Sequence, residues 1–335
     1  MFNKIYEKIK SFIKNNYKFI LLIIIILFMF YYETPYIIYK SGGTIDLNKR
    51  VIVDKDYEES GSFYMSYVTA MKGSPAFVLL SHIIPDWDLE KIEDVSNESS
   101  YDDIMEAGKV YLNEGIDNAI IAAFNESDYD INITKEIIKV IYISDKAKTD
   151  IKVGDTILKI DDHDVNGFNE VRTYINSLKE NQEVNINVKN NGKEYERKAI
   201  IYKDDDNLLK IGVAFNTTYE YETEIPVKIN MKNNESGSSG GLMMSLAVYN
   251  ALTDEDITKG LKIVGTGSIN ADGSIDEIGG VKYKVLGAEK IKADIFFCPK
   301  ENYEEAIEVK NKRKLKIKVV QVESLKDAIE YLNSI

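Results

Sequence analysis

One serine-rich loop has residue types that could do acyl-transfer chemistry. It runs from Asn233 to Gly241 as NNESGSSGG, between a short alternating strand at 226–231 and an apolar helix at 242–252. Glycines let the backbone of such a loop approach a substrate closely, and amides at the start of a helix can stabilise an oxyanion. A serine there could be a nucleophile, although the string alone fits a flexible Gly/Ser linker equally well.

A lysine-containing string downstream of this loop could supply the base for that serine. Thr266-Gly267 precedes it, and the string itself, GGVKYK at 279–284, opens a further helix. A lysine accepts a proton only if its pKa falls from ~10.4 toward neutrality, and apolar surroundings lower a lysine pKa in this way. Apolar residues flank Lys284 in the sequence: Ile278, Val281, Val285 and Leu286. The alternative is a solvated lysine on the helix surface.

Taken in order, these strings resemble the proteolytic domain of the Lon family of serine proteases. The family's nucleophile motif, Gly-Pro-Ser-Ala-Gly, aligns with residues 237–241, so the resemblance places the nucleophile on Ser239. Gly237 and Gly240 then support the loop. Ser238 stands where the family has proline, and Gly240 where it has alanine. The loop is therefore expected to be looser, and Ser238 is a rival nucleophile.

The same resemblance assigns the base. The family's lysine is the second in a Gly-Gly-x-Lys-x-Lys string, which here is Lys284 and not Lys282. The family's Thr-Gly falls on Thr266-Gly267, so Thr266 is expected to hold the amine through its hydroxyl group. The enzyme implied is a serine endopeptidase with a dyad of Ser239 and Lys284, an accepted variant of the Ser–His–Asp arrangement.

Residues 137–203 have the pattern of a PDZ domain. A strand at 137–143 and the string VGDTILKIDDHDV at 153–165 precede an amphipathic helix at 168–178. Two alternating strands follow, joined by the hairpin signal Asn-Asn-Gly at 190–192. This order resembles the PDZ family, which binds extended peptides by adding them as a strand to a sheet edge. We expect the unit to recruit protein or peptide substrates, or to gate the protease site.

The N-terminus has the composition of a membrane anchor. Residues 1–18 carry five lysines against one acid, and FILLIIIILFMFYY at 19–32 has no charge. As a helix this run is about 21 Å long, short for a hydrocarbon core of ~30 Å, but flanking tyrosines and Lys18 could extend the span. We expect a cytoplasmic basic tail over 1–18, a single-pass transmembrane anchor over 19–40 and the catalytic domain outside the cytoplasmic membrane. A cleaved signal peptide is the alternative, although no small-residue cleavage site follows the run.

The composition excludes several other classes of function. The net charge of −13 argues against a nucleic-acid partner, and a half-buried strand with lysines facing water explains the basic run at 310–318. Cys298, the only cysteine, lies in an apolar strand and is expected in the core. His82 lies in an apolar stretch and is expected to be structural. His163 lies among aspartates at 161–164, where a solvated turn is favoured over a metal site; neither a metal nor another cofactor is expected.

These parts predict a multidomain chain of the α/β and α+β classes. An N-terminal transmembrane helix is followed by an extracytoplasmic region of unclear fold at 41–136, the PDZ domain at 137–203 and a Lon-like proteolytic domain at 205–335. Within the unclear region, a strand at 62–68 and a helix at 101–124 are indicated. The order matches the membrane-anchored, PDZ-containing branch of the Lon family that lacks an ATPase domain.

The function implied is cleavage of extended or unfolded protein segments, outside the cytoplasm or in the membrane, without ATP. The alternative is a binding protein in which a PDZ adaptor is joined to an inactive protease-like domain. The presence of Ser239, Thr266 and Lys284 together argues against it. The sequence leaves open the substrate, the cleavage specificity, the oligomeric state and any activation through PDZ binding.

Overall fold

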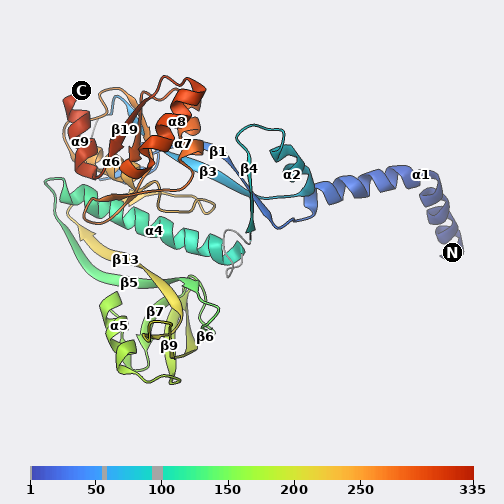
Figure 1. Ribbon diagram of the computed structural model, residues 1–335, viewed down its shortest axis with the longest axis horizontal. Helices are drawn as coiled ribbons and strands as arrows, with labels where there is room; N and C mark the ends of the chain where they lie inside the picture. The colour runs from blue at the N-terminus through green and yellow to red at the C-terminus, as the bar shows by residue number, and fades with distance from the viewer. Residues whose placement is uncertain (1, 55–58, 93–100) are drawn as a thin grey trace. The chain divides into compact units, whose positions relative to one another are not determined.

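The computed structural model describes residues 2–54, 59–92 and 101–335 (Figure 1). The chain forms two compact units. The first comprises residues 1–41 and 68–97, and the second comprises the remaining residues from 42 to 67 and from 98 to 335. All residues predicted to do chemistry belong to the second unit.

The first unit begins with one long apolar helix, α1 (Phe2–Tyr31). Its segment Lys4–Tyr31 is long and apolar enough to cross a membrane, a test that a signal sequence also passes. The helix ends before Pro35, because the residue before a proline is disfavoured in the helical conformation. Residues 36–40, which the sequence assigned to the anchor, instead begin strand β1 (Tyr36–Asp46).

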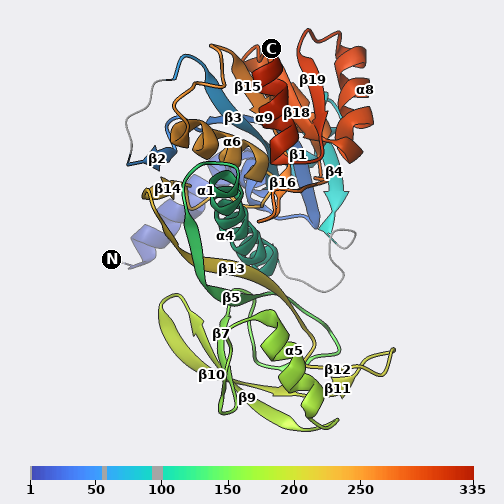
Figure 2. The same ribbon diagram turned by 90° about the vertical axis from the view of Figure 1, so that its left-hand side faces the viewer.

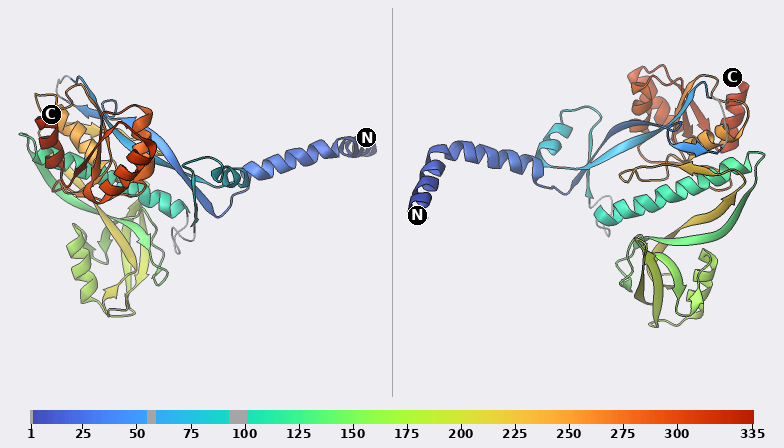
Figure 3. Two further views of the ribbon diagram at one scale, coloured as in Figure 1. Left: turned by 45° about the horizontal axis from the view of Figure 1, so that its top comes forward. Right: turned by 180° about the vertical axis from the view of Figure 1, so that it is seen from behind.

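A short strand and a short helix complete the first unit. Strand β4 (Asp88–Lys91) pairs antiparallel with the start of β1. Helix α2 (Pro75–Ser81) contacts α1 (Figure 3). The side chain of Ser74 caps α2 by accepting a hydrogen bond from the Phe77 amide. His82, at the end of α2, is exposed, and its Nδ1 lies 2.8 Å from a backbone carbonyl oxygen of that helix.

The second unit contains a sheet in which four neighbouring strands, β19, β18, β15 and β3, are parallel. Side chains of β18 alternate between two cores. Ile295 and Phe297 pack with helices α6 and α9, whereas Phe296 and Cys298 pack with α7 and α8. Helices on both faces explain why β18 is apolar throughout. The strands are β19 (Lys318–Val322), β18 (Ile295–Pro299), β15 (Lys262–Gly265) and β3 (Ser62–Lys72). The helices are α6 (Gly241–Leu252), α7 (Val281–Lys290), α8 (Tyr303–Arg313) and α9 (Leu325–Ser334).

Part of the region that the sequence left without a fold belongs to this same domain. Strand β3 covers the strand predicted at 62–68, and Phe63 and Met65 enter the core beside α6. The helix predicted at 101–124 is α4 (Tyr101–Asn125), which packs on α6. The domain is therefore assembled from two stretches of chain, one before and one after the PDZ pattern.

The PDZ pattern folds as a separate sheet with its own core. The strand order is β13-β5-β7-β9-β10-β6, and helix α5 (Phe168–Ser177) packs on this core. The Asn-Asn-Gly turn joins β9 to β10 with positive φ at Asn191 (48°) and Gly192 (77°), as a two-residue hairpin requires. The strands are β13 (Val213–Thr223), β5 (Ile131–Ile143), β7 (Thr156–Ile160), β9 (Glu183–Asn190), β10 (Lys193–Ile200) and β6 (Lys148–Thr149).

Strand β13 joins the PDZ sheet from outside the predicted range of 137–203. It pairs antiparallel with β5 along its whole length, from Val213 opposite Ile143 to Thr223 opposite Ile131. The chain therefore enters the PDZ domain through β5 and leaves it through β13 (Figure 2). Strand β14 (Val227–Ile229) and the serine-rich loop follow. The PDZ domain is thus inserted in the chain between α4 and α6.

Burial settles two predictions about isolated residues. Cys298 is fully buried in β18, and burial raises the pKa of its thiol to about 12, so its role in the core is confirmed. In the basic run, Val319 is buried while Lys316 and Lys318 are exposed. The lysines therefore face water as predicted, although β19 begins at Lys318, so most of the basic run precedes the strand.

Candidate active site

The serine-rich loop ends directly before helix α6, and Ser239 lies in it half-buried. Two donors fix its backbone. The Gly267 amide (2.8 Å) and the Thr266 hydroxyl (2.9 Å) both donate to the Ser239 carbonyl oxygen. In the first turn of α6, the Leu242 amide donates to the Gly267 carbonyl oxygen over 3.1 Å. The Thr-Gly pair thus holds Ser239 at the N-terminal end of α6.

The two glycines predicted to support the loop are needed there for different reasons. A Cβ atom at Gly240 would lie 2.5 Å from the sulfur of Met65. An alanine here, as in the Lon motif, would therefore require the flexible Met65 side chain to move. Gly237 has a φ of +88°, a left-handed conformation that residues with side chains rarely adopt.

Lys284 lies in the first turn of α7 and is only 3% exposed. Val281 and Val285, its apolar neighbours in the sequence, are fully buried. Burial lowers the pKa of the Lys284 amine to about 7, and no carboxylate in the described part of the chain forms an ion pair with it. The alternative of a solvated surface lysine is therefore wrong, and the amine loses its proton near neutral pH.

Thr266 connects the lysine to the nucleophile loop. Lys284 Nζ donates to Thr266 Oγ1 over 3.0 Å, and Thr266 is itself fully buried. A hydroxyl group has one hydrogen, which Thr266 gives to the Ser239 carbonyl oxygen, so the amine is the donor in this contact. A neutral amine that donates one N–H keeps its lone pair, which is what a general base needs.

Thr266 connects Ser239 and Lys284, the predicted nucleophile and base, which do not bond to each other directly. Among the described residues, no hydrogen bond joins Ser239 Oγ to Lys284 Nζ. Catalytic hydrogen bonds are often long without substrate and shorten when it binds. In this arrangement Thr266 alone links the Lys284 side chain to the Ser239 backbone.

Ser238, the rival nucleophile, is engaged elsewhere. Its hydroxyl oxygen lies 2.8 Å from that of Ser268. Ser239 is the loop serine whose carbonyl is bonded to Thr266, which also holds Lys284. The geometry therefore favours Ser239 over Ser238 as the nucleophile.

Helix α4 supports the loop through two glycines that the sequence analysis missed. The Gly237 amide donates to the Gly108 carbonyl oxygen over 2.8 Å. A Cβ atom at Gly115 would lie 3.1 Å from Ser238 Cα. Gly108 and Gly115 are two turns apart on the helix, and glycine inside a helix costs about 1 kcal/mol relative to alanine. That unfavourable composition was the signal that could have identified the packing of α4 on the loop.

Helix α4 also holds strand β13. The Asp117 carboxylate accepts a hydrogen bond from the Tyr219 amide over 3.0 Å, and the Glu114 carboxylate accepts one from the Asn216 side chain over 2.8 Å. Burial raises the pKa of Asp117 to about 6. One helix therefore contacts both the nucleophile loop and the strand that leaves the PDZ domain.

Strand β13 occupies an edge of the PDZ sheet. PDZ domains bind extended peptides as an added strand at such an edge. Here β13 already pairs with β5, and Phe215 of β13 lies edge-on to Phe168 of α5, with ring centroids 6.3 Å apart. An external peptide can take this position beside β5 only if β13 leaves it.

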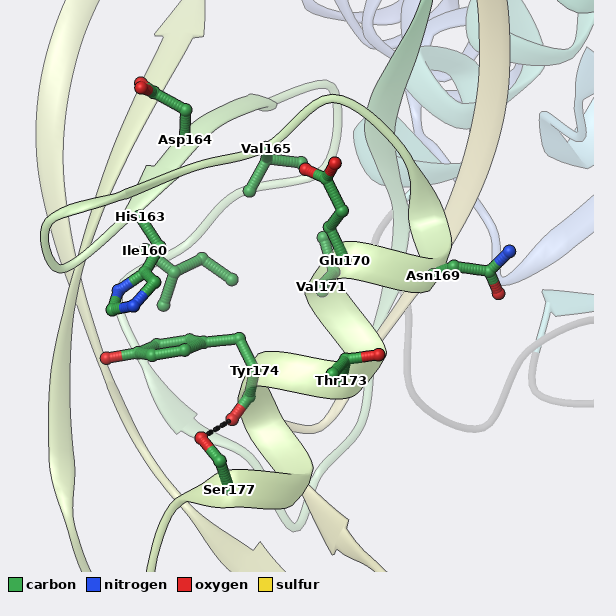
Figure 4. Close-up of a pocket in the computed structure, with 10 residues that line it drawn as sticks. All are labelled: Ile160, His163, Asp164, Val165, Asn169, Glu170, Val171, Thr173, Tyr174 and Ser177. Atoms are coloured by element: carbon green, nitrogen blue, oxygen red, sulfur yellow. Dashed lines mark hydrogen bonds between the residues drawn. The ribbon is translucent and has the colours of Figure 1, made fainter.

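A pocket on the PDZ domain lies between α5 and the turn after β7 (Figure 4). His163 stacks on Tyr174 there, with ring centroids 4.1 Å apart. Tyr174 donates its hydroxyl to Asp161, and Asp164 forms an ion pair with Lys159. These contacts place His163 and its neighbouring aspartates in a structured turn. Across the described ranges, no group of three or more His, Cys, Asp or Glu side chains is arranged to hold a metal ion.

Comparisons with known families agree with this geometry. Residues 210–333 match the Lon protease (S16) C-terminal proteolytic domain, and residues 121–200 match the PDZ domain. The C-terminal part of this chain therefore matches a Lon-type serine peptidase domain. Lon proteases of other organisms align with this C-terminal part.

The relatives of the Lon-type domain are much longer proteins. The Lon protease of the Aster yellows witches'-broom phytoplasma is 30% identical over 93 residues, covering 28% of this chain and 12% of that protein. The Lon protease of Roseiflexus castenholzii is 30% identical over 138 residues, covering 41% of this chain and 17% of that protein. The chain thus spans less than a fifth of the length of these relatives. A solved PDZ domain of an SdrC-like protein from Listeria monocytogenes is 24% identical and covers 25% of this chain and 92% of that one, with a TM-score of 0.23.

Replacement of Lys284 by methionine is expected to abolish activity without destabilising the protein. The pKa of Lys284 is about 7 in the folded protein and ~10.4 in the unfolded chain. Between these two pH values the folded protein binds fewer protons than the unfolded chain. The free energy of unfolding of the wild type therefore rises with pH in this window. Lys284→Met removes the cost of burying the amine, which is on the order of 4 kcal/mol at pH 7. Urea unfolding should show the variant at least as stable as wild type at pH 7, with its relative advantage shrinking toward pH 10.

Two further variants separate the amine's chemistry from its packing. Lys284→Arg should be inactive, because a guanidinium group stays protonated at any usable pH. Lys282→Ala, two residues away on α7, should remain active. A much less stable Lys284→Met protein at pH 7, or an active Lys284→Arg protein, would contradict a neutral, buried base.

Proposed function

We propose that this protein is a membrane-anchored serine endopeptidase that uses Ser239 and Lys284 as a catalytic dyad and works without ATP. One observation carries the proposal. A lysine amine with a pKa near 7 is bonded to the Thr266 hydroxyl, which in turn is bonded to the Ser239 backbone. This supplies a base that is deprotonated near neutral pH next to a serine at the start of a helix.

In the proposed reaction, Ser239 Oγ attacks the scissile carbonyl carbon while Lys284 takes the serine proton. The amides of Ser239 and Gly240 donate to no other group in the described part of the chain and lie at the start of α6, where they can stabilise the oxyanion. The Lys284 ammonium then gives its proton to the leaving amine as the acyl-enzyme forms. Water, deprotonated by Lys284, releases the acid product and restores the serine.

Extended or unfolded protein segments are the proposed substrates. No phosphate-binding Gly-x-x-x-x-Gly-Lys-Ser/Thr string occurs within these 335 residues, so they offer no site of that kind for ATP-driven unfolding. ATP and magnesium should therefore leave the rate of casein cleavage unchanged. Stimulation by ATP would contradict this part of the proposal.

Helix α1 is the proposed anchor, with its lysine-rich start in the cytoplasm and the protease domain outside. The lysines before the apolar run support this orientation. A reporter fused after Ile335 should then be active only outside the cytoplasm. A reporter active in the cytoplasm would overturn both the orientation and the proposed location of the substrates.

Ser239→Ala is the direct test of the nucleophile. It should lower cleavage of unfolded casein by roughly 10⁴-fold or more, with the melting temperature nearly unchanged. Ser238→Ala is the matched control, because its hydroxyl group contacts Ser268 and not the lysine site. It should keep substantial activity. An active Ser239→Ala protein beside an inactive Ser238→Ala protein would move the nucleophile by one residue. A wild-type protein that binds casein but never cleaves it would favour the adaptor function.

For the PDZ domain, we propose gating rather than simple recruitment. Strand β5 is paired with the edge strand β13, and β13 is bonded to Asp117 and Glu114 of α4, the helix that also packs on the serine-rich loop. A peptide that replaces β13 beside β5 would therefore release one side of α4. The gate is the exchange of β13 for an external strand.

A disulfide between β5 and β13 tests the gate. Lys135 and Glu220 lie opposite each other and are both exposed, and residues so paired have Cβ atoms about 5 Å apart, near the reach of a disulfide. The Lys135→Cys, Glu220→Cys protein, when oxidised, should cleave a short peptide normally but lose cleavage of protein substrates by about tenfold, or 1.4 kcal/mol. Reductant should restore it. Cys298 is buried and should not interfere. Equal protein cleavage in both redox states would show that β13 stays in place during catalysis.

A further inference from the structure

An apolar surface in the first unit is not used by the proposed protease chemistry. It lies on α2 and the turn that follows, and we call it the α2 patch. Leu79 is 60% exposed, Leu80 37% and Ile83 76%, and Trp87, which follows them in the chain, is half-buried. Large apolar side chains that gather in one exposed place usually mark a contact surface.

The α2 patch is held next to the end of α1. The Thr34 amide and hydroxyl both donate to the Gly73 carbonyl oxygen, over 2.9 and 2.7 Å, just before α2 begins. Phe30 of α1 lies edge-on to Phe77 of α2, with ring centroids 6.0 Å apart. Phe77 in turn lies 6.3 Å from the ring of Trp87. These contacts belong to one compact unit, so the patch is fixed at the end of α1 from which the chain continues.

The residue types around this point are those of a membrane–water interface. Tyr31 and Tyr32 at the end of α1 are 79% and 55% exposed. The Lys40 amine lies 4.6 Å above the Trp87 ring. Tryptophan and tyrosine are enriched at the headgroup level of a bilayer, and lysine there reaches lipid phosphates while its stem stays in apolar surroundings.

We propose that the α2 patch inserts into the outer leaflet at its headgroup boundary, as a second membrane contact beside α1. The inference rests on the proposed anchoring by α1. Lipid is the occupant because the patch is continuous, through Phe30 and Phe77, with a helix whose apolar surface is uncovered. The two contacts together would hold the first unit in a defined orientation at the membrane surface.

Trp87 is the only tryptophan in the chain, so its fluorescence reports on this patch without labelling. The full chain is reconstituted in phosphatidylcholine vesicles whose acyl chains are brominated either near the headgroup or near the chain ends. Bromine near the headgroup should quench Trp87 more strongly than bromine near the chain ends, and the vesicles should protect it from iodide in the water.

Charged substitutions test whether the α2 patch itself inserts into the bilayer or whether Trp87 is quenched only because α1 holds it near the membrane. Leu79→Glu with Ile83→Glu should remove most of the headgroup-level quenching while the protein still floats with the vesicles. Leu208→Glu, at a 50% exposed site on the PDZ side, is the control and should change nothing. The proposal would be overturned if the protein floats with the vesicles but Trp87 is not quenched, or if the double substitution leaves the quenching unchanged. Either result would leave the anchoring by α1 intact. Protein that fails to float would overturn the anchoring itself.

Discussion

The burial of one amine sets the requirements for the rest of the protease domain. Lys284 is 3% exposed, and this burial favours the neutral amine and lowers its pKa to about 7. Holding an ionisable group in such surroundings is unfavourable, and the surrounding core must offset that cost. Helices on both faces of β18 provide this core, and the lysine lies in one of those helices.

The nucleophile depends on segments that are far apart in the sequence. Met65 from β3 packs against Gly240, Gly108 and Gly115 of α4 lie under the loop, and Thr266 bonds to the Ser239 carbonyl. The PDZ domain is inserted between two of these segments. Its exit strand, β13, is bonded to the same helix α4. Helix α4 therefore contacts both the exit strand of the PDZ domain and the loop that carries Ser239.

Local patterns predicted much of this protein, and remote pairings account for what they missed. The bounds of α4, the PDZ hairpin and the burial of Lys284 follow from short strings whose periodicity or turn chemistry is specific. The place of β3 in the protease sheet could not be predicted, because it depends on parallel pairing with β15, about two hundred residues away. The pairing of β13 with β5 is antiparallel, but it also joins segments that the whole PDZ pattern separates in the sequence, so no local pattern indicated it. Helix α1 ends at Tyr31 and strand β1 begins directly after Pro35, so the helix is shorter than the predicted anchor of 19–40.

The pH dependence of kcat/KM on a short, unstructured peptide tests the central claim most directly. Such a peptide needs no PDZ engagement, so the profile reports the ionisation of the free enzyme's base. If the buried Lys284 is the base, kcat/KM should rise through a single ionisation near pH 7 and then stay constant to about pH 9. The Lys282→Ala protein should give the same profile. Activity that rises only toward pH 10, or that is already flat below pH 6, would contradict Lys284 as the base.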